Sequence, residues 1–497
     1  MAAYLRPGVY VQETLNAVAP VVGANSTSVA AFIGIAARGP LTPTLVTSWS
    51  EYINIYGSWG TNNTLALGVF LFFANGGNQA YVYRVTAGSP VAANRTFNDT
   101  DEGDPTLTVS AINPGAWGVG LAVTIQESPG APDYFDLIVY YGGVSAAYKV
   151  ETFTNLTMVS TDARYALAVV NSQSNWITLA DEASAAVGPL KNPTPAASQA
   201  LASGSDGTTP TTTQIATAVT GFDVVPNSLV LNAPGITESA DVNLLLAYAE
   251  AREDVFVVID PIDDTVANQI DLAGEYTQTS YGAVYYPPIT INDPTNSTRG
   301  TVIVAANPGG AIVGKYAATD KTRGVFKAPA GLGVRVAGAV SVPSLTNANL
   351  DALNTAAAPV NAIRYIPGSG IVVMGARTLK AGFADMYIPV RRSLIYLEKA
   401  LVELTQFSIF EPNDTVLYRQ IKSSLEGFLQ NFWTQGGLRG ASPTEAFFVI
   451  CDSTNNTLAT VEAGQVNIQV GVALQRPAEF VVINIGQFDG GATVTVA

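Results

Sequence analysis

The most informative absence in this chain of 497 residues is histidine, which does not occur at all. Histidine is the usual general base, a common transition-metal ligand and the side chain that changes charge between pH 5 and 8. We therefore expect no catalytic residue, no metal site and no cofactor. No side chain with an unperturbed pKa should titrate between about pH 5.5 and 8.

Cysteine and charge are also scarce. Cys451 is the single cysteine, which excludes an internal disulfide and indicates a small core residue. Charged residues make up 13% of the chain, against about 25% in a typical soluble domain, and the mean hydropathy is +0.24. No apolar run approaches the roughly 20 residues of a membrane span, and no signal peptide is recognisable. Extensive self-assembly, which buries apolar surface between copies, is the better interpretation.

The net charge of −15 argues against a nucleic-acid partner, because phosphates require a cationic face. The length predicts two to four domains. Residues 28–35 and 80–85 are predicted strands on either side of a predicted helix at 65–75. After residue 221 the pattern alternates as in a parallel βαβ sheet, with strands at 228–231 and 255–259, helices at 242–252 and 268–279, and another buried strand at 301–306.

Two further regions differ in texture. Residues 93–214 contain short strand patterns at 107–110, 121–126 and 135–140, followed by a Ser/Thr/Gly/Pro-rich linker at 198–213, and predict an inserted β-rich domain. The last third begins with two helical patterns at 393–406 and 415–433. Strand patterns follow at 466–472, where apolar residues alternate strictly, then at 479–485 and 493–496.

Two motifs suggest a ligand, but the first is incomplete and the second has an alternative explanation. Residues 309–316 (GGAIVGKY) match a phosphate-binding loop as far as Lys315, but Tyr316 stands where a magnesium-binding Ser or Thr is required. Asp260, Asp263 and Asp264 follow a predicted strand and could hold calcium or magnesium. The alternative for them is an acidic loop that caps a helix.

Three segments carry a resemblance to a known family. They are PGVYVQE at 7–13, TDKTRGVFKAPAGL at 319–332 and RRSLIYLEKALVEL at 391–404. Together they resemble the tail sheath proteins of contractile phage tails and related injection particles, from residue 7 to about residue 487. The resemblance implies an α/β and α+β multidomain fold.

The implied domains are an N-terminal arm at 1–22, a discontinuous subtilisin-like α/β middle domain at 23–92 and 215–374, and the inserted β-rich outer domain at 93–214. An α+β C-terminal assembly domain with a C-terminal arm occupies 375–497. Both arms would be shared between subunits. A subtilisin-type Ser-His-Asp triad is excluded because the chain has no histidine.

The resemblance implies a structural role and no enzymatic activity. Copies would stack as hexameric rings around an inner tail tube and contract to drive the tube through the target envelope, for genome ejection in a phage. The implied partners are the chain itself, the tube, baseplate and tail terminator proteins, with no direct membrane insertion. The implied location is the tail of a virion, assembled in the host cytoplasm. Alternatives are the sheath of a phage-derived bacteriocin or extracellular injection system and, more distantly, a non-contractile capsid or surface-layer protein.

Terminal strands expose unpaired backbone groups that can pair with another copy, or else pair within their own subunit. The expected interface residues of the N-terminal arm are Gly8, Val9, Tyr10, Val11, Gln12 and Glu13. Those of the C-terminal strands are Val466, Ile468, Val470, Val472, Val481, Ile483 and Ile485. Arg391, Arg392, Arg419 and Lys422 are expected to face an acidic partner, the inner tube. The alternative is pairing within the chain, such as Lys422 with Glu426.

Overall fold

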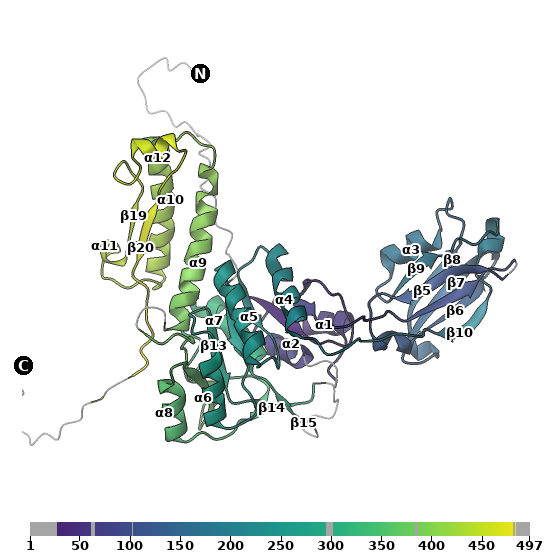
Figure 1. Ribbon diagram of the computed structural model, residues 1–497, viewed down its shortest axis with the longest axis horizontal. Coiled ribbons are helices and arrows are strands. Elements are labelled where there is room, and N and C mark those ends of the chain that lie inside the picture. Colours follow the sequence, from purple (N-terminus) through teal and green to yellow (C-terminus); the bar gives the residue numbers. More distant parts are fainter. Residues whose placement is uncertain are drawn as a thin grey trace, which may run out of the picture.

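The computed structural model describes residues 27–60, 65–101, 103–294, 302–382, 386–480 and 483. It is a mixed α/β protein with three parts (Figure 1). A central α/β body carries a β-rich part on one side, and a tower of two long helices rises from the body on the other. The buried residues form four hydrophobic cores: two in the body, one in the β-rich part and one in the tower.

The body is built on one eight-stranded sheet in the order β18-β17-β13-β12-β11-β1-β3-β2. The six strands from β17 to β3 are parallel, and the two edge strands run antiparallel to their neighbours. Continuous apolar strands such as β12 are expected where both faces of a parallel sheet are covered. The strands are β1 Val29–Gly34, β2 Thr44–Val46, β3 Ala80–Arg84, β11 Leu229–Asn232, β12 Val255–Ile259, β13 Gly282–Tyr286, β17 Val360–Ile366 and β18 Gly370–Val373.

Helices cover both faces of this sheet and make three layers (Figure 1). One face packs on α1 Trp49–Tyr56, α2 Leu65–Ala74 and α7 Gly309–Arg323. The other packs on α4 Thr212–Thr220, α5 Ser239–Arg252, α6 Val266–Glu275 and α8 Asn347–Thr355. Alternate residues of β1 enter the two cores, with Phe32 in the first and Ile33 in the second.

A small antiparallel sheet in the order β15-β14-β16 lies beside the body, formed by β14 Ile289–Asn292, β15 Ile303–Ala306 and β16 Ala339–Ser341. It corrects the prediction of a buried strand at 301–306. Ile303 is 55% exposed, and β15 lies at the edge of this small sheet. The apolar run indicated burial on two sides, but an edge strand packs on only one.

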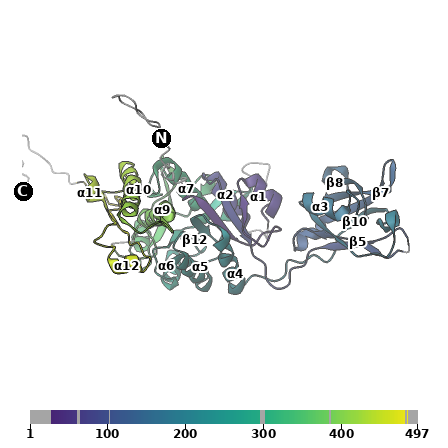
Figure 2. The same ribbon diagram turned by 90° about the horizontal axis from the view of Figure 1, so that it is seen from above.

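The β-rich part contains two antiparallel sheets around its own core, in the orders β10-β6-β7-β8 and β4-β5-β9. Its elements are β4 Asn94–Asn98, β5 Pro105–Ala111, β6 Leu121–Ser128, β7 Ala131–Tyr141, β8 Lys149–Leu156, α3 Ala166–Gln173, β9 Ile177–Asp181 and β10 Ala196–Ala200. The predicted linker at 198–213 is partly ordered by backbone pairing, because bridges join Ala87 to Thr208 and Val91 to Ser205. The two segments that carry these bridges run next to each other between the body and the β-rich part in both views (Figures 1 and 2).

The tower consists of α9 Ile388–Thr405 and α10 Thr415–Thr434, followed by α11 Pro443–Ala446, β19 Phe447–Ile450, α12 Leu458–Glu462 and β20 Gln469–Val472. Asp414 caps α10, because its carboxylate accepts from the backbone N–H groups of Val416 and Leu417. The apolar stripe of α10 is buried in the tower core together with Cys451, as the sequence predicts.

Short 3-10 turns complete the chain at Ala116–Gly120 (η1), Ala146–Tyr148, Gly188–Lys191, Gly221–Val224 and Gln406–Ser408. Among the described residues, no helix has both the length and the apolar character needed to cross a membrane.

Candidate functional site

The second and third of the resembling segments meet at the foot of the tower. Arg392 of α9 and Asp320 of α7 are 72 residues apart, and their side chains are 3% and 5% exposed. The guanidinium binds the carboxylate through both of its terminal nitrogens, with Nη1–Oδ1 at 3.0 Å and Nη2–Oδ2 at 2.5 Å. A bidentate pair of this geometry fixes both side chains in one orientation. It therefore defines how the tower is mounted on the body.

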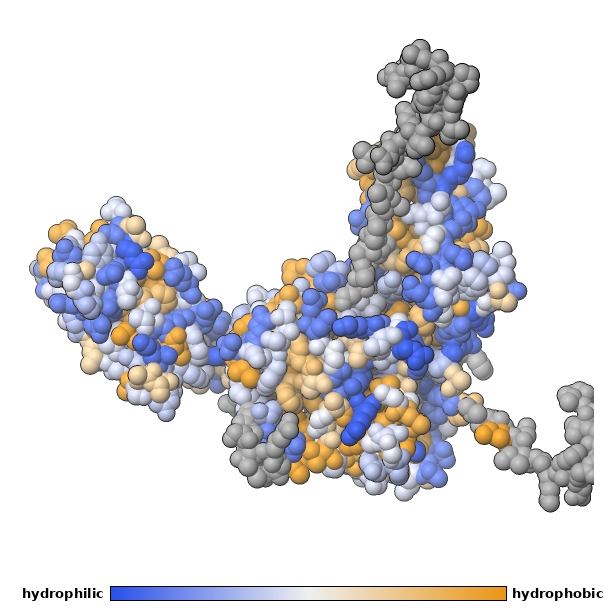
Figure 3. Space-filling model, turned by 180° about the vertical axis from the view of Figure 1, so that it is seen from behind, coloured by the Kyte–Doolittle hydropathy of each residue, from blue (hydrophilic) through white to orange (hydrophobic). Residues whose placement is uncertain are grey.

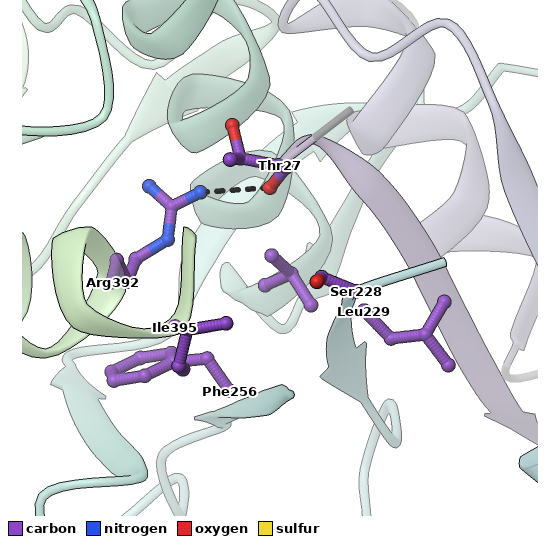
Figure 4. Close-up of a pocket in the computed structure, with 7 residues that line it drawn as sticks. Thr27, Ser228, Leu229, Phe256, Arg392 and Ile395 are labelled. Atoms are coloured by element: carbon purple, nitrogen blue, oxygen red, sulfur yellow. Dashed lines mark hydrogen bonds between the residues drawn. The ribbon is translucent and has the colours of Figure 1, made fainter. Parts of the chain in front are cut away.

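The same pair holds the first described residue. Arg392 Nη2 also donates to the carbonyl of Thr27 at 3.0 Å (Figure 4), and the Thr27 hydroxyl donates to Asp320 Oδ2 at 2.6 Å. Residues 1–22, the predicted N-terminal arm, lie outside the described residues. What the structure shows is that the chain just after this segment is tied to the buried ion pair.

A small cavity of about 10 Å³ lies beside Arg392 (Figure 4). A volume of this size is at the lower limit for a single water molecule, so the cavity offers no room for a substrate or cofactor. Its lining comes from the starts of neighbouring strands and from α9: Thr27, Ser228, Leu229, Val230, Phe256, Arg392 and Ile395.

Aromatic residues extend the contact between Arg392 and Asp320, called the junction below, into the sheet. The guanidinium of Arg392 lies over the ring of Tyr316, 4.6 Å from its centre. The hydroxyls of Tyr316 and Tyr285 are 2.7 Å apart and both side chains are fully buried, which raises the pKa of each phenol well above its usual value. Tyr316, which breaks the phosphate-loop pattern, is thus a structural residue of the junction.

The segment 319–332 continues from the body into the tower. Phe326 packs edge-on against Phe432 of α10, with ring centres 5.7 Å apart, and Tyr396 of α9 contacts the same ring at 5.7 Å. Val325 is buried in the tower core. One segment therefore supplies the carboxylate for Arg392 and, six residues later, an aromatic anchor for the tower.

The residues predicted to face the tube are not equivalent in the structure. Arg392 is buried and paired within the chain, so the prediction is wrong for it. Arg391 donates to the hydroxyls of Ser280 and Tyr281 and stacks on Tyr281, 4.5 Å from the ring centre. The sequence could not reveal these partners, since they lie more than 100 residues away.

Arg419 and Lys422 lie on the outer side of α10. Arg419 is exposed and donates only to the carbonyl of Thr415 within the described residues. Lys422 Nζ is 3.9 Å from Glu426, the pairing within the chain that the sequence left open. Such an exposed pair contributes little to stability, and both cations remain accessible to a partner.

The C-terminal strands pair within their own subunit as far as they are described. β20 runs antiparallel to β19, with Val472 opposite Phe447 and Val470 opposite Val449. The strand is shorter than predicted, because Val466 and Ile468 precede it. The four alternating residues Val466, Ile468, Val470 and Val472 pack against the tower core. Their role in contacts between subunits stays a prediction.

The predicted strand at 479–485 is only partly described, and Val481 and Ile485 lie outside the described residues, as do Gly8, Val9, Tyr10, Val11, Gln12 and Glu13. Glu479 and Phe480 are not in a strand. Instead, Glu479 is clamped to the body by Arg377, at 2.8 Å from Nε and 2.6 Å from Nη2, and accepts from the Tyr387 hydroxyl. Beyond this clamp, Phe480 and Ile483 are 71% and 75% exposed.

The phosphate-loop-like segment forms the start of α7, and its anion position is occupied by the chain itself. The Asp260 carboxylate accepts from the backbone N–H of Gly309 at 2.7 Å and of Gly235 at 3.2 Å. A carboxylate there compensates the positive end of the helix, as a bound phosphate would. Because Asp260 is completely buried, its pKa is raised to about 6. The expectation for pH 5.5 to 8 concerned side chains with an unperturbed pKa, and Asp260 is a buried exception to it.

Helix packing explains the glycines of this segment. A Cβ atom on Gly310 would lie 2.0 Å from the carbonyl oxygen of Gly68, and one on Gly314 would lie 2.5 Å from that of Phe72. Both glycines therefore allow α7 to approach α2 backbone to backbone. The pattern that resembles a phosphate loop is a helix-packing pattern.

The acidic loop after β12 supports the capping alternative. Asp264 accepts from the backbone N–H of Thr265 at 2.6 Å and from the Asn268 side chain at 2.8 Å, and Thr265 caps α6. Asp260, in contrast, is directed to the start of α7. Within the described ranges, no three His, Cys, Asp or Glu side chains are grouped closely enough to hold a metal ion.

Comparison with known proteins agrees with this architecture. No family model matches the chain. The tail sheath protein of Vibrio phage KVP40 is 27% identical over 179 residues, which are 35% of this chain and 25% of that protein. The chain thus matches about a quarter of the length of this curated relative.

Solved structures extend the similarity to nearly the whole chain. The sheath of an extracellular contractile injection system, PVC, in its contracted state has a TM-score of 0.62 at 21% identity, covering 98% of this chain and 99% of that one. The contracted helical sheath of the anti-feeding prophage has a TM-score of 0.60 at 22% identity, with coverages of 97% and 99%. The sheath tail protein of Desulfitobacterium hafniense has a TM-score of 0.59 at 17% identity, with coverages of 89% and 93%.

The fold is that of contractile sheath proteins, a mixed α/β multidomain class. The resemblance to the tail sheath family is confirmed, and these relatives are structural proteins of contractile particles, not enzymes.

Proposed function

We propose that this chain is the sheath subunit of a contractile tail or injection particle. Copies polymerise as stacked hexameric rings around an inner tube and contract to drive the tube through the target cell envelope. The observation that carries this proposal is the match of 98% of the chain to a sheath structure, including body, β-rich part and tower together. A single shared domain would support much less, because one fold serves many functions.

The distribution of surface residues supports assembly. Hydrophobic residues gather on the visible face of the body and along the tower between patches of polar ones (Figure 3). With only 13% charged residues, the chain has limited means to cover a fully solvated surface. If copies bury this surface against one another, less of the apolar surface is left exposed to water.

Contraction needs no catalytic residue in this mechanism. The stored free energy is the sum of small gains at many repeated interfaces, and bistable packing between rigid subunits supplies the switch. The junction at Arg392 suits the task, because it ties Thr27 to both α7 and α9. A mechanical force on residues 1–22, the proposed N-terminal arm, would be transmitted to the body through the buried ion pair that binds Thr27.

The arms complete the assembly. Gly8–Glu13 and the C-terminal residues after the Glu479 clamp pair with neighbouring copies and act as hinges between them. The tower then takes the tube side, with Arg419 and Lys422 toward an acidic tube, while residues 93–214 face outward. The body at 23–92 and 215–374 adopts the subtilisin-like arrangement without its chemistry. Baseplate and tail terminator proteins bind the two ends of the stack.

Two kinds of particle fit this proposal. The tail sheath relative comes from a phage, whereas the PVC and anti-feeding prophage neighbours come from injection systems. Genes for a capsid and terminase beside this one would indicate a phage virion; their absence would indicate a bacteriocin or extracellular injection system. A capsid or surface-layer role is the more distant alternative.

Electron microscopy of the purified chain, alone and with its cognate tube protein, tests the proposal. We expect tubular assemblies with six-fold symmetry, and two sheath lengths in particles isolated before and after triggering. Closed shells or flat lattices would overturn the proposal in favour of a capsid or surface-layer role.

A further inference from the structure

An arginine of the body is inserted into the β-rich part. Arg38 lies in the loop after β1 and is 9% exposed. Its guanidinium carbon is 4.2 Å from the ring centre of Trp176, 5.5 Å from that of Trp117 and 5.6 Å from that of Tyr141. All three rings belong to the β-rich part.

The other side of Arg38 is fixed to the body. Its backbone N–H donates to the carbonyl of Tyr56, and Nη2 donates to those of Ile53 at 3.3 Å and Asn54 at 2.8 Å. These carbonyls are at the C-terminal end of α1, where the helix dipole favours a cation. One guanidinium thus bonds to the end of a body helix and stacks on the rings of another part of the chain.

The three rings form a cage that does not depend on Arg38. Trp117 lies in η1, Tyr141 ends β7 and Trp176 immediately precedes β9. Their ring centres are 5.0 Å apart for Tyr141 and Trp176, and 6.2 and 6.3 Å from Trp117 to the other two. Each ring also packs against the core of the β-rich part. The cage is therefore built by that core, and a planar guanidinium can stack on its rings while it keeps its hydrogen bonds to the body.

A second arginine holds the chain at the crossing itself. Arg84, the last residue of β3, is 1% exposed and donates to carbonyls on both sides, including Ala36 at 3.0 Å and Pro114 at 2.6 Å. Its Nη2 is 3.5 Å from Asp206, which also accepts from the backbone N–H of Ala116. Arg84 thus holds together the segments where the chain leaves the body, whereas Arg38 contacts the aromatic rings inside the β-rich part.

The covalent connection alone leaves the orientation open. The chain passes between body and β-rich part along only two segments, 85–93 and 201–211, which pair through the isolated bridges at Ala87–Thr208 and Val91–Ser205. Parts joined by a narrow connection move relative to one another unless an interface holds them. We propose that Arg38 in its aromatic cage is that interface: a latch which fixes the angle of the β-rich part, so that it turns with the body as one piece. This inference stands independently of the sheath function.

The test compares the orientation of the two parts in the full chain. Spin labels are placed on Val144→Cys in the β-rich part and Asp351→Cys in the body, both exposed, with Cys451→Ala as background. Distances between the labels are measured in the otherwise unchanged chain and in Arg38→Ala, Arg38→Lys and Trp176→Leu variants. Arg95→Ala is the control for loss of an arginine, because Arg95 is an exposed arginine in β4 of the β-rich part and is not one of the residues that contact the aromatic cage.

We expect a narrow distance distribution in the unchanged chain and in Arg95→Ala, and one at least about twofold broader in Arg38→Ala, since only the narrow connection and the Arg84 contacts at its base then restrict the orientation. Arg38→Lys should also broaden it, because a hydrated ammonium keeps the charge but cannot stack on the cage. Distributions as narrow as the unchanged chain's in the Arg38 variants would overturn the proposal. If Arg38→Ala does not fold, judged by circular dichroism, the Arg38→Lys and Trp176→Leu variants decide the question by the same criterion.

Discussion

Arg392 and Asp320 form a bidentate ion pair in which the two side chains are only 3% and 5% exposed. Each belongs to a different one of the segments by which the chain resembles sheath proteins, and the pair also binds Thr27. The segments are therefore neighbours in space as well as markers in sequence. They build the joint between body, tower and the chain that leaves toward the N-terminus.

Breaking this pair on one side should destabilise the tower strongly. Arg392→Met leaves the Asp320 carboxylate buried without its partner, which we expect to cost about 3–5 kcal/mol. Adding Asp320→Leu should restore much of the loss, because the unpaired charge is then gone. Thermal unfolding and hydrogen exchange along α9 measure both effects. Arg419→Met, at an exposed site, should change stability by no more than about 0.5 kcal/mol; equal losses in both single variants would contradict the interpretation.

The glycines of α7 should respond in the opposite way from an exposed helical glycine. Gly314→Ala forces a methyl group against the backbone of α2, and we expect a loss of about 1–3 kcal/mol. Gly427 of α10 meets no atom within 4 Å of an added Cβ, so Gly427→Ala should stabilise the chain by about 1 kcal/mol through helix propensity. Denaturation curves of the two variants provide the comparison. Stabilisation by both would mean that the helices do not pack this closely.

Because of Asp260, the stability of the folded chain should depend on pH at values above those at which ordinary carboxylates titrate. Burial raises its pKa from 3.8 to about 6, so the folded chain holds the proton more tightly than the unfolded chain. The stability due to that proton is present at low pH and is lost as the pH rises toward 6. Relative to Asp260→Asn, the unchanged chain should therefore lose roughly 2 kcal/mol between pH 4.5 and 7.

The control for this pH effect is Asp264→Asn. The Asn268 side chain and the Thr265 N–H lower the pKa of Asp264, so its contribution to stability is lost only as the pH falls below its ordinary range. The difference between this variant and the unchanged chain should stay constant from pH 4.5 to 7. Melting temperatures across that range decide the matter, and a flat Asp260→Asn difference would show that Asp260 stays charged throughout.

Removal of residues 1–13 should leave a folded subunit that cannot build long sheaths. The deletion removes the backbone pairing between copies expected from Gly8–Glu13, while Thr27 and its ion pair remain. Melting temperature should match that of the full chain, and electron microscopy should show short or disordered assemblies. Contractile tubes of normal length from the shortened chain would refute a donated N-terminal strand.

Local apolar patterns located the most deeply buried elements closely. The predicted strand at 255–259 is β12 residue for residue, and the helix predicted at 65–75 is α2 less its last residue. Periodicity failed where apolar composition did not reveal the number of covered faces. β15 is an exposed edge, and Val466 and Ile468 lie outside β20 although their side chains are half-buried.

The sequence by itself determined the class of protein: without histidine, with little charge and with three family-like segments in order, it indicated an assembling structural protein. The tertiary structure decided what individual polar residues do. Arg392 was predicted to meet a partner and is buried. Asp260 was predicted to act together with Asp263 and Asp264, and instead its carboxylate binds the start of α7. Arg38 was not singled out in the sequence as a contact residue. The physical reason is range. Whether a residue is buried can be inferred from the residues next to it in the sequence. The partner of a charged side chain depends on which distant segments the fold brings within about 4 Å of it.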